Sequence, residues 1–258
     1  VGDVQPGFNV KAGLTLKIKG NCSQSRIEAG GDIEMGGMAG GGVGQIFCGG
    51  KINARYLNDA YIECKKDLKV KNEIVSCIVK CGGLVDVNMG AVVGGNCMAL
   101  TGFEAKGFGS EAKAKTRLSC GFCYMALEKM QAIRAELDPI RREVEILSKR
   151  LEPFVKNPKA MLAISQKDRE LVKENAKRLN TILPQQESLQ KRYKEIEADM
   201  EERANPIINA RSYCFSGVVI AIGSSVEEVT VNINRPTTII RNSRKGRLRL
   251  LPLHSITD

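Results

Sequence analysis

A short phrase recurs through the first half of the chain and limits what it can fold into more than any other feature. In each copy an alanine or cysteine anchor stands before a turn pair, and an aliphatic residue usually stands two places earlier. Consecutive anchors are separated by 16 to 19 residues, and they are Ala12, Ala29, Cys48, Cys64 and Cys81. Repeats of this length that read strand, tight turn, strand are typical of solenoids. We therefore predict a parallel β-helix with the anchors pointing inward.

The lengths of the coils bear on the handedness of this β-helix. A left-handed β-helix needs a strict hexapeptide rhythm, which residues 27–33 and 46–52 follow, but the coil lengths vary. We therefore expect the right-handed form. The glycine-rich run at residues 35–44 is interpreted as a bulging turn of one enlarged coil, and Cys97 is expected to be the anchor after Cys81.

From about residue 122 the hydrophobic residues change to spacings of three and four, which indicates helix. We predict a first helix of about 30 residues and, after a capping Ser165, a second one. Neither helix can hide its apolar stripe alone, so an antiparallel coiled-coil hairpin is expected. Pro139 and Pro184 are predicted to bend the two helices at matching heights. The expected seam is Leu127, Met130, Ile133, Leu137, Ile140, Val144, Leu147, Leu151 and Phe154 on the first helix and Val172, Asn175, Leu179, Ile182, Gln186, Leu189, Tyr193, Ile196 and Met200 on the second.

After Pro206 the strand pattern returns, and residues 229–233 and 247–251 are both predicted to be strands. The chain is thus expected to leave the β-helix, form the hairpin and return to finish the β-helix. The fold class is mainly β with an inserted α hairpin. Its parts are a parallel β-helix at residues 1–121, the coiled-coil insertion at residues 122–205 and return strands at residues 206–258.

Cysteine usage indicates the cellular compartment of the protein, and the first residue bears on whether the chain is part of a longer one. The nine cysteines are odd in number and several share one repeat position, which argues against a disulfide framework. Free buried thiols persist in a reducing compartment, so we expect a cytoplasmic protein. No run of about 18 apolar residues is present, and no membrane span is expected. Because it opens on Val1 without a methionine, we expect the chain to lack an N-terminal region of a longer protein.

Three cysteines are weak candidates for a metal or redox cluster. Cys120 and Cys123 form a C-x-x-C pair, and Cys214 follows the second helix, where closure of the hairpin could bring it close. Zinc needs four ligands, and a redox pair needs a thioredoxin-like context. Core packing is the favoured interpretation, and we expect neither a metal nor a cofactor.

Catalytic residues are not expected. Enzymes that act on polysaccharides with a β-helix fold need clustered acids or bases on one exposed face. Asp32, Asp67 and Asp86 instead fall near turns, and the sole histidine, His254, lies in the C-terminal tail. The sequence therefore predicts a protein that is not an enzyme.

The excess of Lys and Arg, a formal net charge of +10, marks two candidate surfaces for a partner. One lies on the first long helix and the other on the C-terminal strand. Nucleic acid is not expected, because no aromatic residues are interleaved for base stacking. An acidic protein or an anionic membrane surface fits better. The candidate partner-binding residues are Arg134, Arg141, Arg142, Arg244, Lys245, Arg247 and Arg249.

The order of these parts resembles the flagellar assembly protein A family. The matching segments are residues 27–33, 46–52, 94–95, 108–110, 116–121 and 213–223. The chain departs from the family pattern at Ser216, where proline is usual, and at Lys65 and Lys66, which replace the glycine pair. The resemblance implies a non-enzymatic cytoplasmic protein of flagellar assembly.

Three functions follow from these observations. The first is an interaction protein in which a β-helix platform displays a coiled-coil arm, serving flagellar assembly or its placement at the cell pole. The second is a polymer-forming cytoskeletal scaffold, because open β-helix ends can stack on one another, which would also give homo-oligomers. The third is a polysaccharide-active enzyme.

Overall fold

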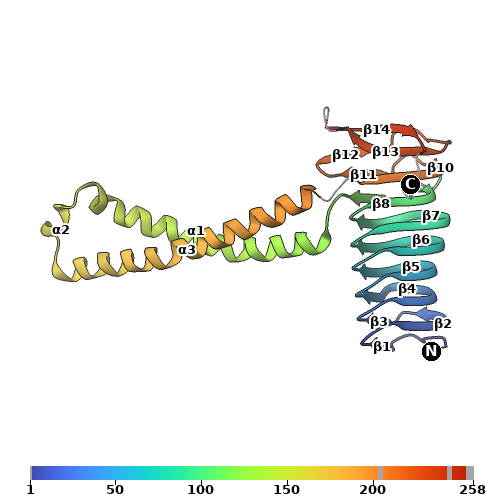
Figure 1. Ribbon diagram of the computed structural model, residues 1–258, viewed down its shortest axis with the longest axis horizontal. Helices are drawn as coiled ribbons and strands as arrows, with labels where there is room; N and C mark the ends of the chain where they lie inside the picture. Colours follow the sequence, from blue (N-terminus) through green and yellow to red (C-terminus); the bar gives the residue numbers. More distant parts are fainter. Residues whose placement is uncertain (1, 203–205, 243–245, 254–258) are drawn as a thin grey trace. The chain divides into compact units, whose positions relative to one another are not determined.

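The computed structural model describes the chain apart from residues 1, 203–205, 243–245 and 254–258 (Figure 1). Two compact units are present. The first combines residues 1–125 with residues 203–258 and contains the strands, and the second is formed by residues 126–202 and is helical.

Fourteen strands of the first unit form one sheet that winds as a parallel solenoid of about six turns (Figure 1). The strands before the helices are β1 (Asn9–Ala12), β2 (Leu16–Ser23), β3 (Arg26–Ala29), β4 (Ile33–Cys48), β5 (Ile52–Cys64), β6 (Leu68–Cys81), β7 (Leu84–Ala99), β8 (Gly102–Phe108) and β9 (Thr116–Cys120). Those after them are β10 (Ile207–Cys214), β11 (Val219–Ile222), β12 (Ser225–Glu228), β13 (Thr237–Asn242) and β14 (Arg247–Pro252). A parallel solenoid is confirmed, and its right-handed sense stays a prediction.

The anchors stack in register, one per coil, as the repeat predicted. Cys64 pairs with Cys48 on one side and with Cys81 on the other. The prediction for Cys97 was wrong, because Ala99 pairs with Cys81. Side chains on a strand alternate with period two, so Cys97 still points inward, but two residues earlier along β7. The anchor column is Ala12, Ala29, Cys48, Cys64, Cys81, Ala99 and Cys120.

A second column of large apolar side chains fills the centre of the solenoid, and we call it the aliphatic column. Each member pairs with the next across one parallel ladder, and most are fully buried. Stacking identical positions one strand spacing apart lets side chains of similar shape interlock along the axis. The aliphatic column consists of Leu16, Ile33, Ile52, Leu68, Val85, Phe103 and Ile208.

The chain returns to the solenoid by adding strands to its last coil. β10 pairs parallel with β8, and β11 pairs parallel with β9. β12, β13 and β14 are then added in antiparallel pairs, so the regular coil pattern stops here. The last rungs therefore differ from the repeat that precedes them.

Residues 229–233 were predicted to be a strand, and this was wrong. β12 ends at Glu228, and beyond it only Ile233 forms an isolated bridge, with Cys214. Apolar and polar residues alternate in this segment as they do in a strand, and Val229 and Ile233 both pack against the core. The Val229 N–H donates to Val218 O and the Val229 carbonyl accepts from the Gly217 N–H, while Ile233 exchanges both hydrogen bonds with Cys214. These bonds hold the two ends of the segment, and among the described strands no ladder runs between them.

The second unit contains α1 (Tyr124–Lys156), whose first residues belong to the first unit, α2 (Ala160–Ala163) and α3 (Gln166–Glu202). α1 and α3 run side by side in opposite directions (Figure 1), and Arg178 Nε donates to Glu143 Oε1 between them at 2.6 Å. Ser165 Oγ accepts from the Asp168 N–H at 3.2 Å, which confirms the predicted cap. Among the described side chains of the arm, the buried ones all belong to the predicted seam and are Ile133, Leu137, Leu147, Leu151 and Ile182. The side chain of Met200, which was also predicted for the seam, lies outside the described part.

The prolines lie inside the helices rather than at their ends. Pro139 is within α1 and Pro184 within α3. Ile140 and Pro184 line the same hollow of the arm, so the two prolines stand at similar heights. The matched bend and the coiled-coil character of the packing stay predictions.

Candidate functional site

The three cysteines considered for a metal or redox cluster belong to separate parts of the solenoid. Cys120 is in the anchor column, where it pairs with Ala99. Cys214 pairs with Phe108 in another column, and Cys123 is half-buried beyond β9. Within the described part of the chain, no group of three or more His, Cys, Asp or Glu side chains is arranged to hold a metal ion.

The anchor thiols hydrogen-bond to the turns of the solenoid. Cys48 Sγ donates to Gly31 O at 3.2 Å, and Cys64 Sγ donates to Gly50 O at 3.1 Å. The neighbouring Cys64 thiol and burial raise the pKa of Cys48 well above its usual range. Burial raises the pKa of Cys120 to about 12. These groups are therefore neutral thiols at pH 7 and poor nucleophiles.

We expect Cys123 to be alkylated rapidly in the folded protein and the other eight cysteines slowly, because it is the one cysteine of the nine that is not buried. Iodoacetamide labelling followed by mass spectrometry measures this. In the Cys123→Ser variant the rapid phase should disappear. Rapid labelling of Cys48, Cys64 and Cys81 in the native protein would contradict the inward placement of the anchors.

The acidic residues of the turns have a packing role that explains the Gly-Gly-Asp phrase. Asp32 Oδ1 accepts from the Lys51 N–H at 2.8 Å, and a Cβ on Gly50 would lie 2.0 Å from the same oxygen. Asp67 Oδ1 meets Gly83 in the same way, at 2.3 Å from where its Cβ would be. The carboxylate of one coil thus replaces a side chain in the turn of the next coil and satisfies one of its backbone donors.

Asp86 takes part in a charge cluster on the outer face of the solenoid. Arg211 donates to Glu104 Oε1 at 2.6 Å and to Asp86 Oδ1 at 3.4 Å. Burial raises the pKa of Asp86 above its ordinary value, and the guanidinium only partly offsets it. Because Arg211 is on β10 and the two acids are on β7 and β8, this cluster ties the return strand to the coils before it.

A basic groove lies in the arm, and we define it by Arg134 and Arg141 of α1 and Lys194 of α3. The hollow has a volume of about 460 Å³, with Leu137 at its base and Tyr193 in its wall. Two of the predicted partner-binding residues therefore lie together. Arg142 does not line this groove, and its Nε donates to the carbonyl oxygen of Asp138 in its own helix at 3.3 Å.

Lys194 was missed by sequence reasoning. In an antiparallel hairpin that turns near residue 161, positions equally far from the turn lie opposite each other, which places residue 188 opposite Arg134 and residue 181 opposite Arg141. This count does not reach Lys194, and only the structure shows that it lines the same hollow as the two arginines.

The C-terminal basic residues are divided by what the structure describes. Arg247 and Arg249 are exposed on β14, the last strand of the sheet. Arg244, Lys245 and His254, which were also considered, lie outside the described residues.

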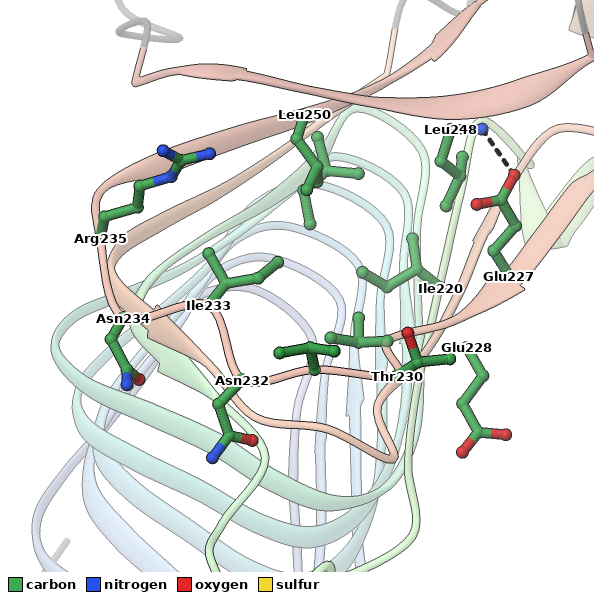
Figure 2. A pocket seen from close by; sticks show the side chains of 13 residues that line it. Ile220, Glu227, Glu228, Thr230, Asn232, Ile233, Asn234, Arg235, Leu248 and Leu250 are labelled. Atoms are coloured by element: carbon green, nitrogen blue, oxygen red, sulfur yellow. Dashed lines mark hydrogen bonds between the residues drawn. The ribbon is translucent and has the colours of Figure 1, made fainter.

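A pocket of about 550 Å³ opens at the C-terminal end of the solenoid (Figure 2). Its base is apolar, because Ile220 and Ile239 are 1% exposed. Polar side chains surround its mouth, and Glu227 Oε1 accepts from the Leu248 N–H at 2.9 Å. The lining residues labelled in the figure include Glu228, Thr230, Asn232, Ile233, Asn234, Arg235, Leu248 and Leu250.

No helix in the described ranges is long and apolar enough to cross a membrane. The fold and these surfaces define a class of protein: a parallel β-solenoid interrupted late by a helical insertion, whose stacked thiols and turn carboxylates serve packing. Residues 1–248 match the Flagellar Assembly Protein A beta solenoid domain, and the chain belongs to that family. This confirms the family resemblance. Comparisons with curated proteins and with solved structures give no match.

Proposed function

We propose that this protein is a non-enzymatic flagellar assembly factor of the cytoplasm that holds an acidic partner protein in the basic groove of its helical arm. The family match supports the flagellar role. The observation that carries the binding role is the convergence of Arg134, Arg141 and Lys194 around one hollow.

The charge balance of the arm supports an anionic occupant. Arg178 and Lys149 on the same two helices are held by Glu143 and Glu145. Among the described residues, no ion pair involves Arg134, Arg141 or Lys194. Within the same part of the chain, the one acidic residue that lines the groove is Glu197. Like charges this close repel one another, and carboxylates of a partner would relieve that repulsion.

The hollow also offers apolar surface that a bound partner can bury. An exposed ion pair alone contributes little to the free energy of binding, roughly 0.2–1 kcal/mol, because water screens it. Here the cations surround buried Leu137 and half-buried Tyr193, so an acidic segment with an apolar residue would be partly desolvated on binding. Arginine and tyrosine at such positions are frequent among the residues that dominate interface energies.

The structure of the solenoid favours the role of a platform over the two alternative functions, a polymer-forming scaffold and a polysaccharide-active enzyme. Head-to-tail polymerisation needs two complementary open ends, and the antiparallel strands β12, β13 and β14 interrupt the coil pattern at the C-terminal end. A polysaccharide-active site needs facing acids. Asp32 and Asp67 instead accept hydrogen bonds from backbone N–H groups of the next coil.

We expect a triple charge reversal, Arg134→Glu, Arg141→Glu and Lys194→Glu, to abolish motility while the protein stays folded and abundant. The full-length protein would carry these changes in the bacterium that encodes it, and spreading in soft agar would be measured. Partner capture by the purified protein should fall at least about tenfold, since several charge contacts are reversed at once.

The matched control reverses Lys129, Arg150 and Lys173, which are exposed on the same helices outside the basic groove. It makes the same change in net charge. If the control variant loses motility to the same extent, or if the groove variant retains both motility and partner capture, the basic groove is not the binding site.

A further inference from the structure

The aliphatic column continues past the coils and ends unfinished. Ile208 pairs with Ile239 of β13, and Ile239 pairs with Leu250 of β14. Ile239 is 1% exposed, but Leu250 is 47% exposed. Every member of the column between Leu16 and Leu250 has a paired strand on both sides. Leu250 lacks that cover because, in the described part of the sheet, β14 pairs only with β13.

The backbone of β14 shows which groups face outward at this edge. The Leu248 N–H is bonded to Glu227 Oε1, and the Gly246 carbonyl accepts from Ser225 Oγ at 2.8 Å. Both acceptor and donor belong to side chains of β12, so these backbone groups point away from β13. Strand geometry repeats every two residues, and the Leu250 N–H therefore points the same way. Side chains of β12 thus cap the first half of the edge and leave the half around Leu250 open.

The pocket shown in Figure 2 lies against this open half. Leu248 and Leu250 form one wall and Ile233 lies across from them. Its volume of about 550 Å³ accommodates one or two aliphatic side chains. A strand added beside β14 would place one such side chain over Leu250 and into this space.

The charges at this end select the occupant. Ion pairs among the described residues involve none of four arginines around β13 and β14: Arg235, Arg241, Arg247 and Arg249. An antiparallel β14 from a second copy would bring its own Arg247 and Arg249 beside these, and like charges opposite each other destabilise a pair of strands. An acidic strand is stabilised by the same positions.

We propose that the open edge of β14 binds an extended segment of a partner protein in which acidic and aliphatic residues alternate, as one further strand. The aliphatic residue opposite Leu250 enters the pocket. The acidic residue opposite Arg249 lies on the outer face, because Leu250 and Arg249 point to opposite sides of the strand. Main-chain hydrogen bonds give such strand addition its affinity and the alternate pockets give its specificity. This surface is separate from the basic groove, so the two proposals fail independently.

The probe is a fluorescein-labelled peptide of about eight residues in which Glu and Val alternate. Fluorescence anisotropy with the full chain should show saturable binding that weakens as salt is added. A peptide of the same composition with all Glu before all Val, and one in which Lys replaces Glu, should bind at least about tenfold more weakly.

Two variants test the geometry. Leu250→Pro removes the outward N–H without removing a β13 hydrogen bond, as Pro252 already does at the equivalent edge position, and it should lower affinity at least about tenfold. Arg249→Glu should lower it by a similar factor and remains informative if the proline variant is unstable. Leu250→Val keeps the N–H and an aliphatic side chain, and Lys71→Glu reverses an exposed charge elsewhere on the solenoid. Both controls should bind within about twofold of the unchanged chain.

Three results would overturn the proposal. One is no binding of the alternating peptide at about 1 mM, where even weak interactions are detected. Another is equal binding of the block or lysine peptide. The third is affinity that survives both Leu250→Pro and Arg249→Glu. Circular dichroism of each variant verifies that the comparison is made between folded chains.

Discussion

Truncation of Phe103 to alanine is expected to lower the free energy of unfolding of the solenoid by about 3–5 kcal/mol. The Phe103 side chain is fully buried and stands in the aliphatic column between Val85 and Ile208. Parallel ladders on both sides fix the backbone of β8, so neighbouring side chains cannot collapse into the space left behind. Urea unfolding followed by circular dichroism measures the change.

Phe8→Ala is the matched control, since Phe8 is 63% exposed. It makes the same chemical change and should cost less than about 0.5 kcal/mol. Equal effects of the two truncations would contradict the placement of Phe103 at the junction between the coils and the return strand. A loss confined to β10 and the strands after it would show that the last rungs unfold separately from the earlier coils.

Deleting the arm, residues 126–202, is expected to remove the helical signal and to leave the solenoid folded. The two ends on the solenoid side already meet, because a Cβ on Gly121 would lie 2.9 Å from Pro206 Cγ. The Gly223 N–H also donates to Cys120 O at 3.1 Å, so the return strands are held by their own ladder. A Gly/Ser linker of about six residues is flexible enough to join the cut ends.

Circular dichroism and thermal unfolding of the deletion variant test this expectation. The helical bands should vanish, and the β signal and a cooperative transition should remain. A second variant that keeps the arm but carries a Gly/Ser insertion of equal length after α2 controls for the linker itself. If the deletion abolishes the β signal while the insertion variant is folded, the arm is an integral part of the solenoid.

The main features of the fold could be predicted because they depend on local patterns. Anchors from Ala12 to Cys81 recur at nearly constant spacing, and a parallel solenoid is the arrangement that stacks such positions in register. The seam of the helices was predicted equally well, since the period of an α-helix fixes which residues share a face. Ile133, Leu147 and Ile182 are buried as that period requires.

Two predictions failed where the hydrophobic pattern showed correctly which side chains are buried but did not determine the path of the backbone. Cys97 points inward as expected but belongs to a different column, because the coil that carries it continues two residues further before its turn. Residues 229–233 alternate like a strand, yet their backbone crosses the end of the core instead of joining a ladder. Alternation reports which side chains are buried and does not report what the backbone pairs with.

For the candidate sites, the sequence determined residue types and the tertiary structure decided their grouping. Basic residues on the first helix were evident, but only the antiparallel course of α3 brought Lys194 beside Arg134 and separated Arg142 from both. The pocket at the end of the solenoid was not predictable at all. It exists because antiparallel strands replace the next coil and leave Leu250 uncovered, and strand order is set by contacts between residues far apart in the chain.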